Sequence, residues 1–525
     1  MTRSFAAYAR IVAFTTALLA GMAGHTGVSK AETPDSDCSG ECFVLTSMTI
    51  QGVSAYPLAD LAPTYDQNLA RWINVADLVL VADAITERYR RDGYFLTRAV
   101  VAPSNHSDGA AYIVVYEGYI GAIEVEGSGA DVVSPVLQPL KDGRALTVAA
   151  LDRRLALASD IPGIRLKSRI EPMLDDPSQH RLVITADLDR IDAGIYTDNR
   201  GSDAQGPWQT YANSSVNSAF VRGDRVTVSA LTVPEDPHEL TYGELAYSVP
   251  IADATRVRAT ASAYWTDAPA DAVGWLSGKS QAASVAVTQA LVRSRVASLW
   301  ATAGLDIRQV KQTYDQIGSI EERLAVARLT LSGRRKVGQG YVAATAQVSH
   351  GLDLFGSTIE PSPLLTRSDA TSEFTKATAS VSAYQDLGRF VGIYAEASAQ
   401  YSADPLLASE EFYVGGPGVG RAYNYGEVSG DAGIAAVVEL RAGWDPKPAP
   451  ISFAQGYAFV DAAQVTNHRP TGHVRRELSS VGIGARITFQ QRATFKVELA
   501  KPVGPRPYTE PDNGWRVFVS LSKEF

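Results

Sequence analysis

The stretch Ala493-Thr-Phe-Lys-Val-Glu-Leu499 alternates apolar and charged residues from its phenylalanine onward. Successive side chains of an extended strand point to opposite sides, so Lys496 and Glu498 share one face and three apolar residues share the other. Strands with one apolar and one charged face are typical of transmembrane barrels, whose outside meets lipid and whose inside holds water. This stretch therefore predicts a membrane-spanning β-strand.

Residues 432–444 and 255–265 have the same pattern. In the first of these segments, Glu439 and Arg441 lie on one face and only apolar residues on the other. A soluble β-sandwich is the alternative, but its polar faces would not hold Arg and Glu so consistently. We therefore expect a charged lumen, lined among others by Glu439, Arg441, Lys496 and Glu498.

Sixteen alternating segments follow residue 189, separated by turn and loop residues. They begin near residues 191, 207, 221, 239, 255, 279, 297, 319, 338, 372, 390, 432, 454, 477, 492 and 514. A tilted spanning strand needs about 9–11 residues, and only a closed barrel satisfies strand backbones in lipid. The predicted fold is an all-β, 16-stranded transmembrane β-barrel over 189–525, preceded by two smaller α+β domains.

The last segment ends the chain on Phe525. A terminal aromatic residue on an alternating strand resembles the sorting signal of bacterial outer-membrane barrels. This likeness indicates a bacterial outer membrane as the site of the barrel.

Residues 43–188 mix helical and strand patterns. Apolar residues recur every three to four positions in 74–93, which predicts an amphipathic helix that stops at Gly93. Strands are expected at 94–101 and 112–116, which complete a first unit over 43–117. A second unit is expected over 118–188, and both units are expected to have a strand, two helices and two strands in that order. In the second unit the strands lie near 122–127, 164–172 and 181–188, and the helices near 131–140 and 147–159.

The N-terminus has the layout of a secretory signal peptide over 1–31, with Arg3 and Arg10 before a short apolar run. A membrane-anchoring helix is the alternative, but the run is short for a span. Cys38 and Cys42 then lie in a short segment over 32–42, and we expect them to form a disulfide in an exported chain.

Composition excludes several classes of function. The net charge of −9 gives no basic surface for nucleic acid, and two cysteines cannot build a zinc or iron–sulfur site. His468 and His473 are close in sequence but lack carboxylate or thiol neighbours, so no metal site is expected. No catalytic constellation and no phosphate loop is readable, so we expect neither an enzyme nor a cofactor.

Several motifs resemble the outer-membrane transporters of two-partner secretion, the haemolysin/haemagglutinin secretion-activation family within the Omp85 superfamily. The stretch Ile85–Tyr94 and residues 97–103 and 115–118 look like the family's first POTRA domain, and 118–188 matches its second. The matching POTRA residues are Gly93, Tyr94, Pro103, Glu117 and Gly118.

Residues 411–431 resemble the family's inner loop, which enters the barrel between its eleventh and twelfth strands. The loop carries Gly415, Gly416, Arg421, Tyr423, Gly430 and Asp431. The next strand carries Phe459 and Asp461, although Ala463 stands where the family's motif has glycine, and Ala422 also departs from the family's pattern.

The resemblance implies that Arg421 reaches across the lumen to Asp461. A guanidinium can bind a carboxylate bidentately, and we expect this pair to lock the loop inside the barrel. Some members also carry an N-terminal plug helix, which we do not expect here, so closure would depend on the loop. The alternative is that Arg421 is one more solvated lumen charge.

The implied function is ATP-independent export of one unfolded cognate exoprotein, which is taken up by POTRA domains in the periplasm. The exoprotein is of adhesin or haemolysin type, and a contact toxin is equally open. Candidate docking sites are the sheet edge at 164–170 and the groove beside the second unit's helix; a mere scaffold role for the domains is the alternative. Implied partners are outer-membrane lipid and, during biogenesis, the barrel assembly machinery, with the transporter a monomer. The competing function is an Omp85-type assembly and insertion factor, although such factors usually carry more POTRA domains.

Overall fold

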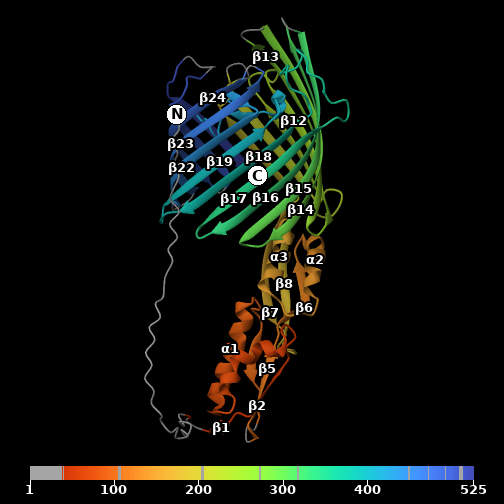
Figure 1. The fold of residues 1–525 in the computed structure, drawn as a ribbon, viewed down its shortest axis with the longest axis vertical. Helices are drawn as coiled ribbons and strands as arrows, with labels where there is room; N and C mark the ends of the chain where they lie inside the picture. The colour runs from red at the N-terminus through yellow and green to blue at the C-terminus, as the bar shows by residue number, and fades with distance from the viewer. Residues whose placement is uncertain are drawn as a thin grey trace, which may run out of the picture.

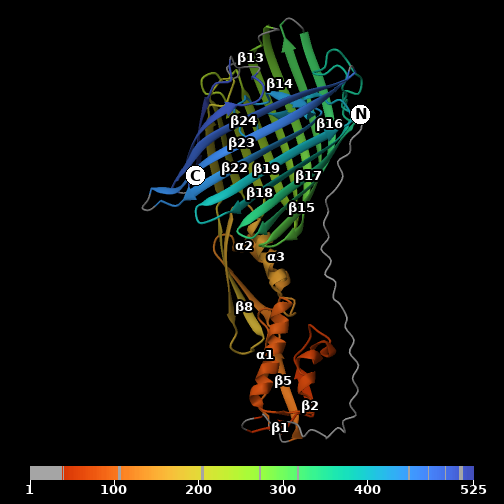
Figure 2. The same ribbon diagram turned by 60° about the vertical axis from the view of Figure 1, so that its left-hand side comes forward.

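The computed structural model describes residues 38, 41–104, 108–202, 206–270, 274–315, 318–446, 450–470, 472–490, 492–507 and 512–525. The expected signal peptide and residues 32–37 lie outside the described residues. Two α+β units form a column beneath one end of a β-barrel (Figures 1 and 2). Among the described helices, none is both long and apolar enough to cross a bilayer.

The first α+β unit is built on a three-stranded sheet in the order β2-β5-β4. Its elements are β1 (Phe43–Val44), β2 (Ser47–Gln51), the 3₁₀ helices η1 (Leu58–Thr64) and η2 (Asp66–Asn68), β3 (Trp72–Ile73), α1 (Val75–Arg91), β4 (Arg98–Val101) and β5 (Ala110–Tyr116). Helix α1 buries Val81, Ile85 and Tyr89 against Ile113 and Val115 of the central strand. Each such side chain contributes about 1.5–3 kcal/mol when removed from water.

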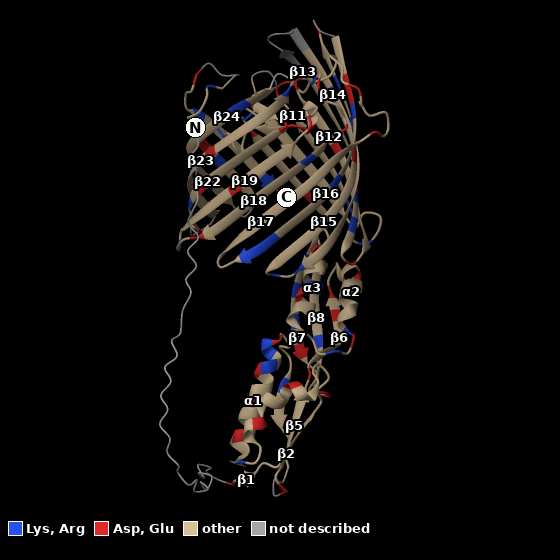
Figure 3. Cartoon of the chain, viewed as in Figure 1, with Lys and Arg blue, Asp and Glu red and all other residues tan. Residues whose placement is uncertain are grey.

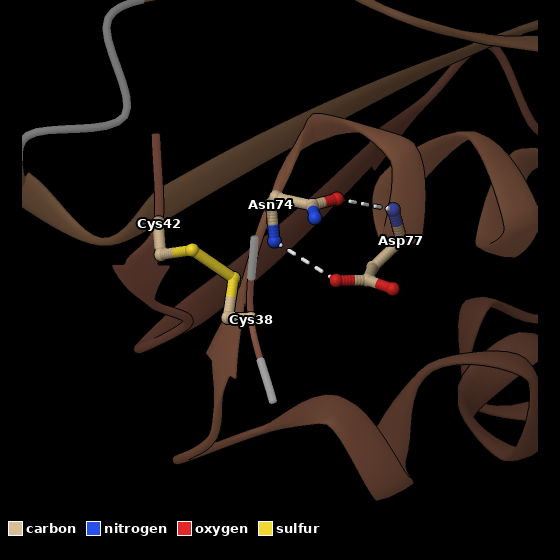
Figure 4. The surroundings of a disulfide bond; sticks show 4 residues. All are labelled: Cys38, Cys42, Asn74 and Asp77. Carbon is tan, nitrogen blue, oxygen red and sulfur yellow. Dashed lines mark hydrogen bonds between the residues drawn. A yellow bond between two sulfur atoms is a disulfide. The ribbon is translucent and has the colours of Figure 1, made fainter. Parts of the chain in front are cut away.

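Local sequence signals fix the ends of α1. Asn74 and Asp77 form a reciprocal capping box at its start, beside the disulfide between Cys38 and Cys42 (Figure 4). Acidic residues stand near its start and three arginines in its last turn (Figure 3), which suits the helix dipole. Gly93, at φ +94°, then turns the chain away.

Two sequence expectations for this unit need correction. The strand expected from Tyr94 begins only at Arg98, because residues 94–97 form turns closed by backbone hydrogen bonds such as Tyr94 N–H to Tyr89 O at 2.8 Å. The first of the two expected helices is the 3₁₀ helix η1, which contains Pro63.

The second α+β unit has a sheet in the order β6-β8-β7, covered by two helices. Its elements are β6 (Tyr119–Glu126), α2 (Ala130–Leu137), η4 (Gln138–Leu140), α3 (Val148–Ser159), β7 (Ile164–Pro172) and β8 (Gln179–Leu188). Val133, Leu137 and Leu151 of the helices are buried against Leu182 and Ile184 of the central strand.

The rest of the chain forms the predicted closed barrel of sixteen antiparallel strands. They are β9 (Ile191–Asp198), β10 (Gln209–Asn217), β11 (Arg225–Thr232), β12 (Thr241–Ala252), β13 (Thr255–Ala270), β14 (Gly274–Arg293), β15 (Ala297–Tyr314), β16 (Gly318–Val337), β17 (Gly340–Leu352), β18 (Thr375–Asp386), β19 (Val391–Ser402), β22 (Ala432–Trp444), β23 (Ile451–Arg469), β24 (Gly472–Phe489), β25 (Ala493–Pro502) and β26 (Arg516–Glu524). The first and last strands close the ring by pairing Gly194–Asp198 with Ser520–Glu524. All sixteen strands begin within a few residues of their predicted positions.

The two faces of the wall differ as the alternation predicts. Val438 and Leu440 of β22 are exposed on the outside, whereas Glu439 between them is fully buried inside. Trp265 and Trp444 are exposed toward opposite ends of the wall, where interfacial aromatic residues are expected.

Glu117, at the end of β5, joins three parts of the first unit. It accepts hydrogen bonds from the Ser54 hydroxyl, from the Ser54 and Ala55 amides at 2.9 Å each, and from the Tyr89 hydroxyl at 2.5 Å. Burial opposes ionisation, but the hydrogen bonds from Ser54, Tyr89 and Ala55 outweigh it and lower the pKa of Glu117. Burial, assisted by Asp92, in turn raises the pKa of the neighbouring Tyr56 to about 12.

A carboxyl with a lowered folded-state pKa adds stability above its unfolded pKa of about 4.3 and loses it as the pH falls through the folded value. Glu117→Gln should therefore destabilise the first unit by about 1–3 kcal/mol at pH 7. The difference from wild type should shrink below about pH 4. Hydrogen exchange of peptides from residues 47–56 in the full-length protein measures this difference in stability. The variant Glu124→Gln, which changes an exposed glutamate, is the control. A difference that stays constant with pH would contradict this account.

Candidate functional site

The connection between β19 and β22, the eleventh and twelfth barrel strands, folds into the barrel as predicted. It contains the 3₁₀ helix η5 (Ala408–Glu410) and a short hairpin of β20 (Phe412–Val414) and β21 (Val428–Gly430). We call residues 403–431 the inner loop. Its apolar residues share one buried cluster with the inner faces of β22 to β26: Val414, Ala422, Tyr423, Val428, Ala435, Val437, Tyr457, Phe459, Ala463, Val465, Leu478, Ala500 and Phe518.

A tight turn at the tip of the hairpin requires glycine. Gly415 has φ +118°, and a Cβ there would lie 2.2 Å from the carbonyl oxygen of Asn424. Gly416, at φ +103°, donates its amide to Tyr423 O at 3.2 Å. The glycines thus fold the tip so that the amides of Gly420 and Arg421 point at the barrel wall.

Asp461 of β23 receives those two amides. Its Oδ1 accepts from Gly420 N–H at 2.9 Å and its Oδ2 from Arg421 N–H at 3.2 Å. The Ser480 hydroxyl of β24 adds a third hydrogen bond at 2.6 Å. Successive backbone amides form a nest that suits an anion, and Asp461 is only 2% exposed.

The Arg421 guanidinium reaches past Asp461 to two other carboxylates. It lies 2.6 Å from Glu439 of β22 and 3.5 Å from Glu498 of β25, and it stacks 4.6 Å from the Phe459 ring centre. Both glutamates are fully buried.

The predicted bidentate pair of Arg421 with Asp461 is therefore wrong in its chemistry, although the two residues do meet. The tip presents its backbone to Asp461, and hydrogen bonds from backbone amides already occupy both carboxylate oxygens. The longer guanidinium side chain extends to the next carboxylates along the lumen.

Each of these glutamates is shared among several cations. Glu439 also pairs with Arg441 at 2.5 Å and Arg486 at 3.3 Å. Glu498 pairs with Arg200 and, at 3.1 Å, with Lys496. Glu498 also accepts from the Tyr457 hydroxyl at 2.7 Å, and Arg200 donates to Arg421 O at 3.0 Å.

The base of the inner loop is held by a second ionic cluster. Arg367, in the connection between β17 and β18, lies 2.6 Å from Asp431 and 3.3 Å from Glu411, and also donates to His468 O. Asp431 additionally accepts the Leu406 and His468 amides at 2.7 Å each. The connection between β17 and β18 thus also folds into the barrel, and it holds the inner loop on both sides of its hairpin, at Glu411 and at Asp431.

A third cluster binds η5 to the opposite wall. Glu410 pairs with Arg328 of β16 and Lys376 of β18, each at 2.8 Å. Arg328 is also paired with Asp306 of β15. The inner loop is thereby attached to strands on both sides of the lumen.

The sequence located part of this site. Tyr423 donates to Pro505 O at 2.8 Å, and Gly430 lies so close to β23 that a Cβ would meet the Thr466 backbone at 2.8 Å. Arg200 lies two residues beyond the end of β9, and the sequence assigned it no role. Arg367, Arg328 and Glu410 were missed, because no local signal marks a loop or lumen residue as the partner of a residue far along the chain.

The remaining predicted residues lie elsewhere. Gly93, Tyr94, Glu117 and Gly118 belong to the core and turns of the first α+β unit, while Pro103 is exposed beyond β4. Phe525 is 64% exposed at the barrel rim, and its amide donates to Ala193 O at 3.0 Å.

The two histidines considered for metal binding do contact each other. His468 and His473 are joined through their Nδ1 atoms at 2.9 Å. Within the described part of the chain, no group of three or more His, Cys, Asp or Glu residues is arranged to hold a metal ion.

Comparison with known proteins agrees with this architecture. Residues 181–487 match the family described as haemolysin secretion/activation protein ShlB/FhaC/HecB, and residues 43–118 match the ShlB-type POTRA domain. The chain belongs to the ShlB/FhaC/HecB family. Its two α+β units are accordingly called POTRA domains below.

Two relatives show how far the similarity reaches, one over most of the chain and one over part of it. The outer membrane transporter CdiB of Escherichia coli O6:K15:H31 (strain 536 / UPEC) is 25% identical over 481 residues, which are 83% of this chain and 78% of that protein. The haemolysin transporter protein ShlB of Serratia marcescens is 27% identical over 228 residues, 40% of this chain and 39% of that protein.

Solved structures share the fold. CdiB from Escherichia coli superposes with a TM-score of 0.77 at 21% identity, covering 94% of this chain and 93% of that one. BamA from Haemophilus ducreyi lacking POTRA domains 1–3 gives a TM-score of 0.51 at 14% identity, covering 92% and 100%.

The contacts predict that Asp461, rather than the Arg421 guanidinium, anchors the loop tip. Asp461→Ala leaves two buried amides without an acceptor, each costing about 1–3 kcal/mol, whereas Arg421→Ala leaves Glu439 and Glu498 with their other cations. Hydrogen exchange at residues 420 and 421 should therefore accelerate more in Asp461→Ala. Arg258→Ala, a lumen arginine paired with Glu244, is the control. Faster exchange in Arg421→Ala than in Asp461→Ala would reverse the assignment.

The second cluster predicts a separate effect at the loop base. Arg367→Ala leaves the buried Asp431 carboxylate without its cation, at a cost of about 3 kcal/mol. Exchange across 403–411 should accelerate while residues 420 and 421 stay protected. Arg323→Ala, which removes an exposed arginine of β16, is the matched control. Unchanged exchange across 403–411 would show that Arg367 does not hold the base.

Proposed function

We propose that this protein exports one unfolded cognate exoprotein across the bacterial outer membrane, without ATP. The barrel lies in the outer membrane and the two POTRA domains lie in the periplasm. The observation that carries the proposal is a charged lumen occupied by the hairpin of the inner loop, with POTRA domains directly beneath its periplasmic mouth. The similarity to the CdiB and ShlB transporters supports the same activity.

The POTRA domains take up the cargo before it enters the barrel. Among the strands of the described residues, β7 of the second domain pairs only with β8, so the other edge of β7 carries backbone groups without a strand partner there. An extended polypeptide can add to such an edge, with main-chain hydrogen bonds giving affinity and side-chain contacts giving selectivity. The edge at 164–170 and the groove beside the second domain's helices are the candidate docking sites.

The inner loop sets whether the lumen conducts. Its hairpin fills space between β22 to β26 and the opposite wall, so an exoprotein can pass only when the loop shifts or leaves. Because Asp461, Arg421, Arg367 and Glu410 attach it through separate contacts, displacement can occur in steps. The energy for net export then comes from cargo folding outside the cell.

Domain boundaries are placed at 31/32, 42/43, 117/118 and 188/189, and Phe525 serves as the sorting signal read by the barrel assembly machinery. The mature transporter contacts outer-membrane lipid and acts as a monomer. The cargo is a large exoprotein of adhesin, haemolysin or contact-toxin type.

The competing function is an assembly and insertion factor for barrel proteins. The fold shared with BamA makes it reasonable, since that fold alone does not distinguish the two activities. The hairpin fastened at both base and tip favours a gated exporter.

Deletion of the gene distinguishes these functions. An exporter predicts that one large protein disappears from the medium or cell surface while outer-membrane composition is unchanged. Complementation with wild type should restore it, and Asp461→Ala should alter its rate of export. A general loss of outer-membrane barrels, with no single missing exoprotein, would instead support the assembly role.

A further inference from the structure

The second POTRA domain is clamped to the barrel by opposite charges. Arg154 and Asp160 of this domain pair with Asp253 at 2.7 Å and Arg293 at 2.6 Å. Two further pairs, Asp152 with Arg295 at 2.8 Å and Asp131 with Arg222 at 3.2 Å, reach neighbouring turns. Helices α2 and α3 are thereby held against three consecutive periplasmic turns of the barrel (Figure 1).

A cavity of about 530 Å³ lies between these helices and the barrel wall. Val132, Val136 and Leu157 line it from the helices, and Ala254 and Trp300 line it from the barrel. Neither domain forms it alone, and its size is that of a binding pocket rather than a packing defect.

The barrel side of this cavity belongs to the lumen. Thr288 and Arg256, which also line it, are cross-strand neighbours, and the Thr288 hydroxyl bonds that of Thr302 at 2.9 Å. Val287, next to Thr288, is exposed on the outer face, so Thr288 points inward. Trp300 shares the face of Thr302, and a membrane lipid would therefore have to pass the wall to reach it.

The aspartates around the cavity are already ion-paired, and the cation Arg256 is hydrogen-bonded to neutral oxygens of the barrel. Asp131, Asp160 and Asp253 are each paired with an arginine. Arg256 donates to Gly223 O at 2.9 Å and to the Ser248 hydroxyl at 3.2 Å. The cavity thus favours a neutral, apolar group over an ion, in contrast to the charged lumen above it.

We propose that this cavity, the mouth pocket, binds a bulky apolar side chain of the unfolded cargo as it passes from the POTRA domain into the lumen. The inference rests on the proposed export function, and it identifies the first site at which the cargo binds inside the barrel mouth. Continuity with the lumen face selects a polypeptide as occupant, and the apolar lining selects leucine-like or aromatic side chains. Binding there aligns the chain below the inner loop.

Two synthetic peptides of equal length and charge test the pocket. One carries leucines spaced among serines and glycines, and the other replaces each leucine by serine. Full-length protein in lipid nanodiscs should bind the leucine peptide at least about ten-fold more tightly by fluorescence anisotropy, the low end of what burying one leucine contributes. Equal affinities for the two peptides would overturn the proposal.

Ala254→Trp should fill the pocket and abolish the tighter binding of the leucine peptide. Val136→Ser should reduce this preference for the leucine peptide without adding bulk. Ala259→Trp adds the same bulk on the lipid face of β13 and should leave it intact. A preference that persists in both Ala254→Trp and Val136→Ser would place the peptide elsewhere and overturn the proposal. Lost export on gene deletion together with equal peptide binding would reject the mouth pocket alone, whereas unchanged secretion on deletion would reject the export function.

Discussion

The structure depends on one constraint: strands surrounded by lipid must satisfy every backbone hydrogen bond among themselves. The pairing of β9 with β26 closes the ring and meets that constraint. Closure also creates an inside, where side chains that cannot face lipid must go. Glu439 and Glu498 can be buried as charged residues because the closed wall gives them a polar interior.

That interior solves its charge problem by sharing. Each buried glutamate contacts several cations, and each cation near the loop tip has a carboxylate or carbonyl within reach. A shared network tolerates the loss of one member better than an isolated buried pair, which would be left uncompensated. It can therefore hold a loop firmly and still exchange partners when the loop moves. The periplasmic mouth of the lumen is built differently. There, charged residues of the second POTRA domain pair with charged residues of the barrel turns, and apolar side chains line the cavity between them.

The barrel wall was predictable because apolar and polar residues alternate along each strand. In β25, Lys496 and Glu498 face inward as expected, because a strand fixes side-chain direction by the parity of position alone. Helix α1 was equally readable from its apolar spacing and its capping residues. The expectation for Arg421 was only half right, since the motif identified the neighbours but not which atoms of the loop would meet Asp461. Backbone geometry at Gly415 and Gly416 decided that.

By itself, then, the sequence determined the sixteen strands, their lipid and lumen faces, the two α+β units and the position of the inner loop along the chain. These follow from local periodicity, which a strand or helix expresses wherever it lies. Only the tertiary structure decided that Arg367 fastens Asp431, that Glu410 binds Arg328 and Lys376, and that POTRA helices and barrel turns enclose a common cavity. Such contacts join residues from tens to well over a hundred positions apart, and barrel closure and domain docking, which no local pattern encodes, bring them together.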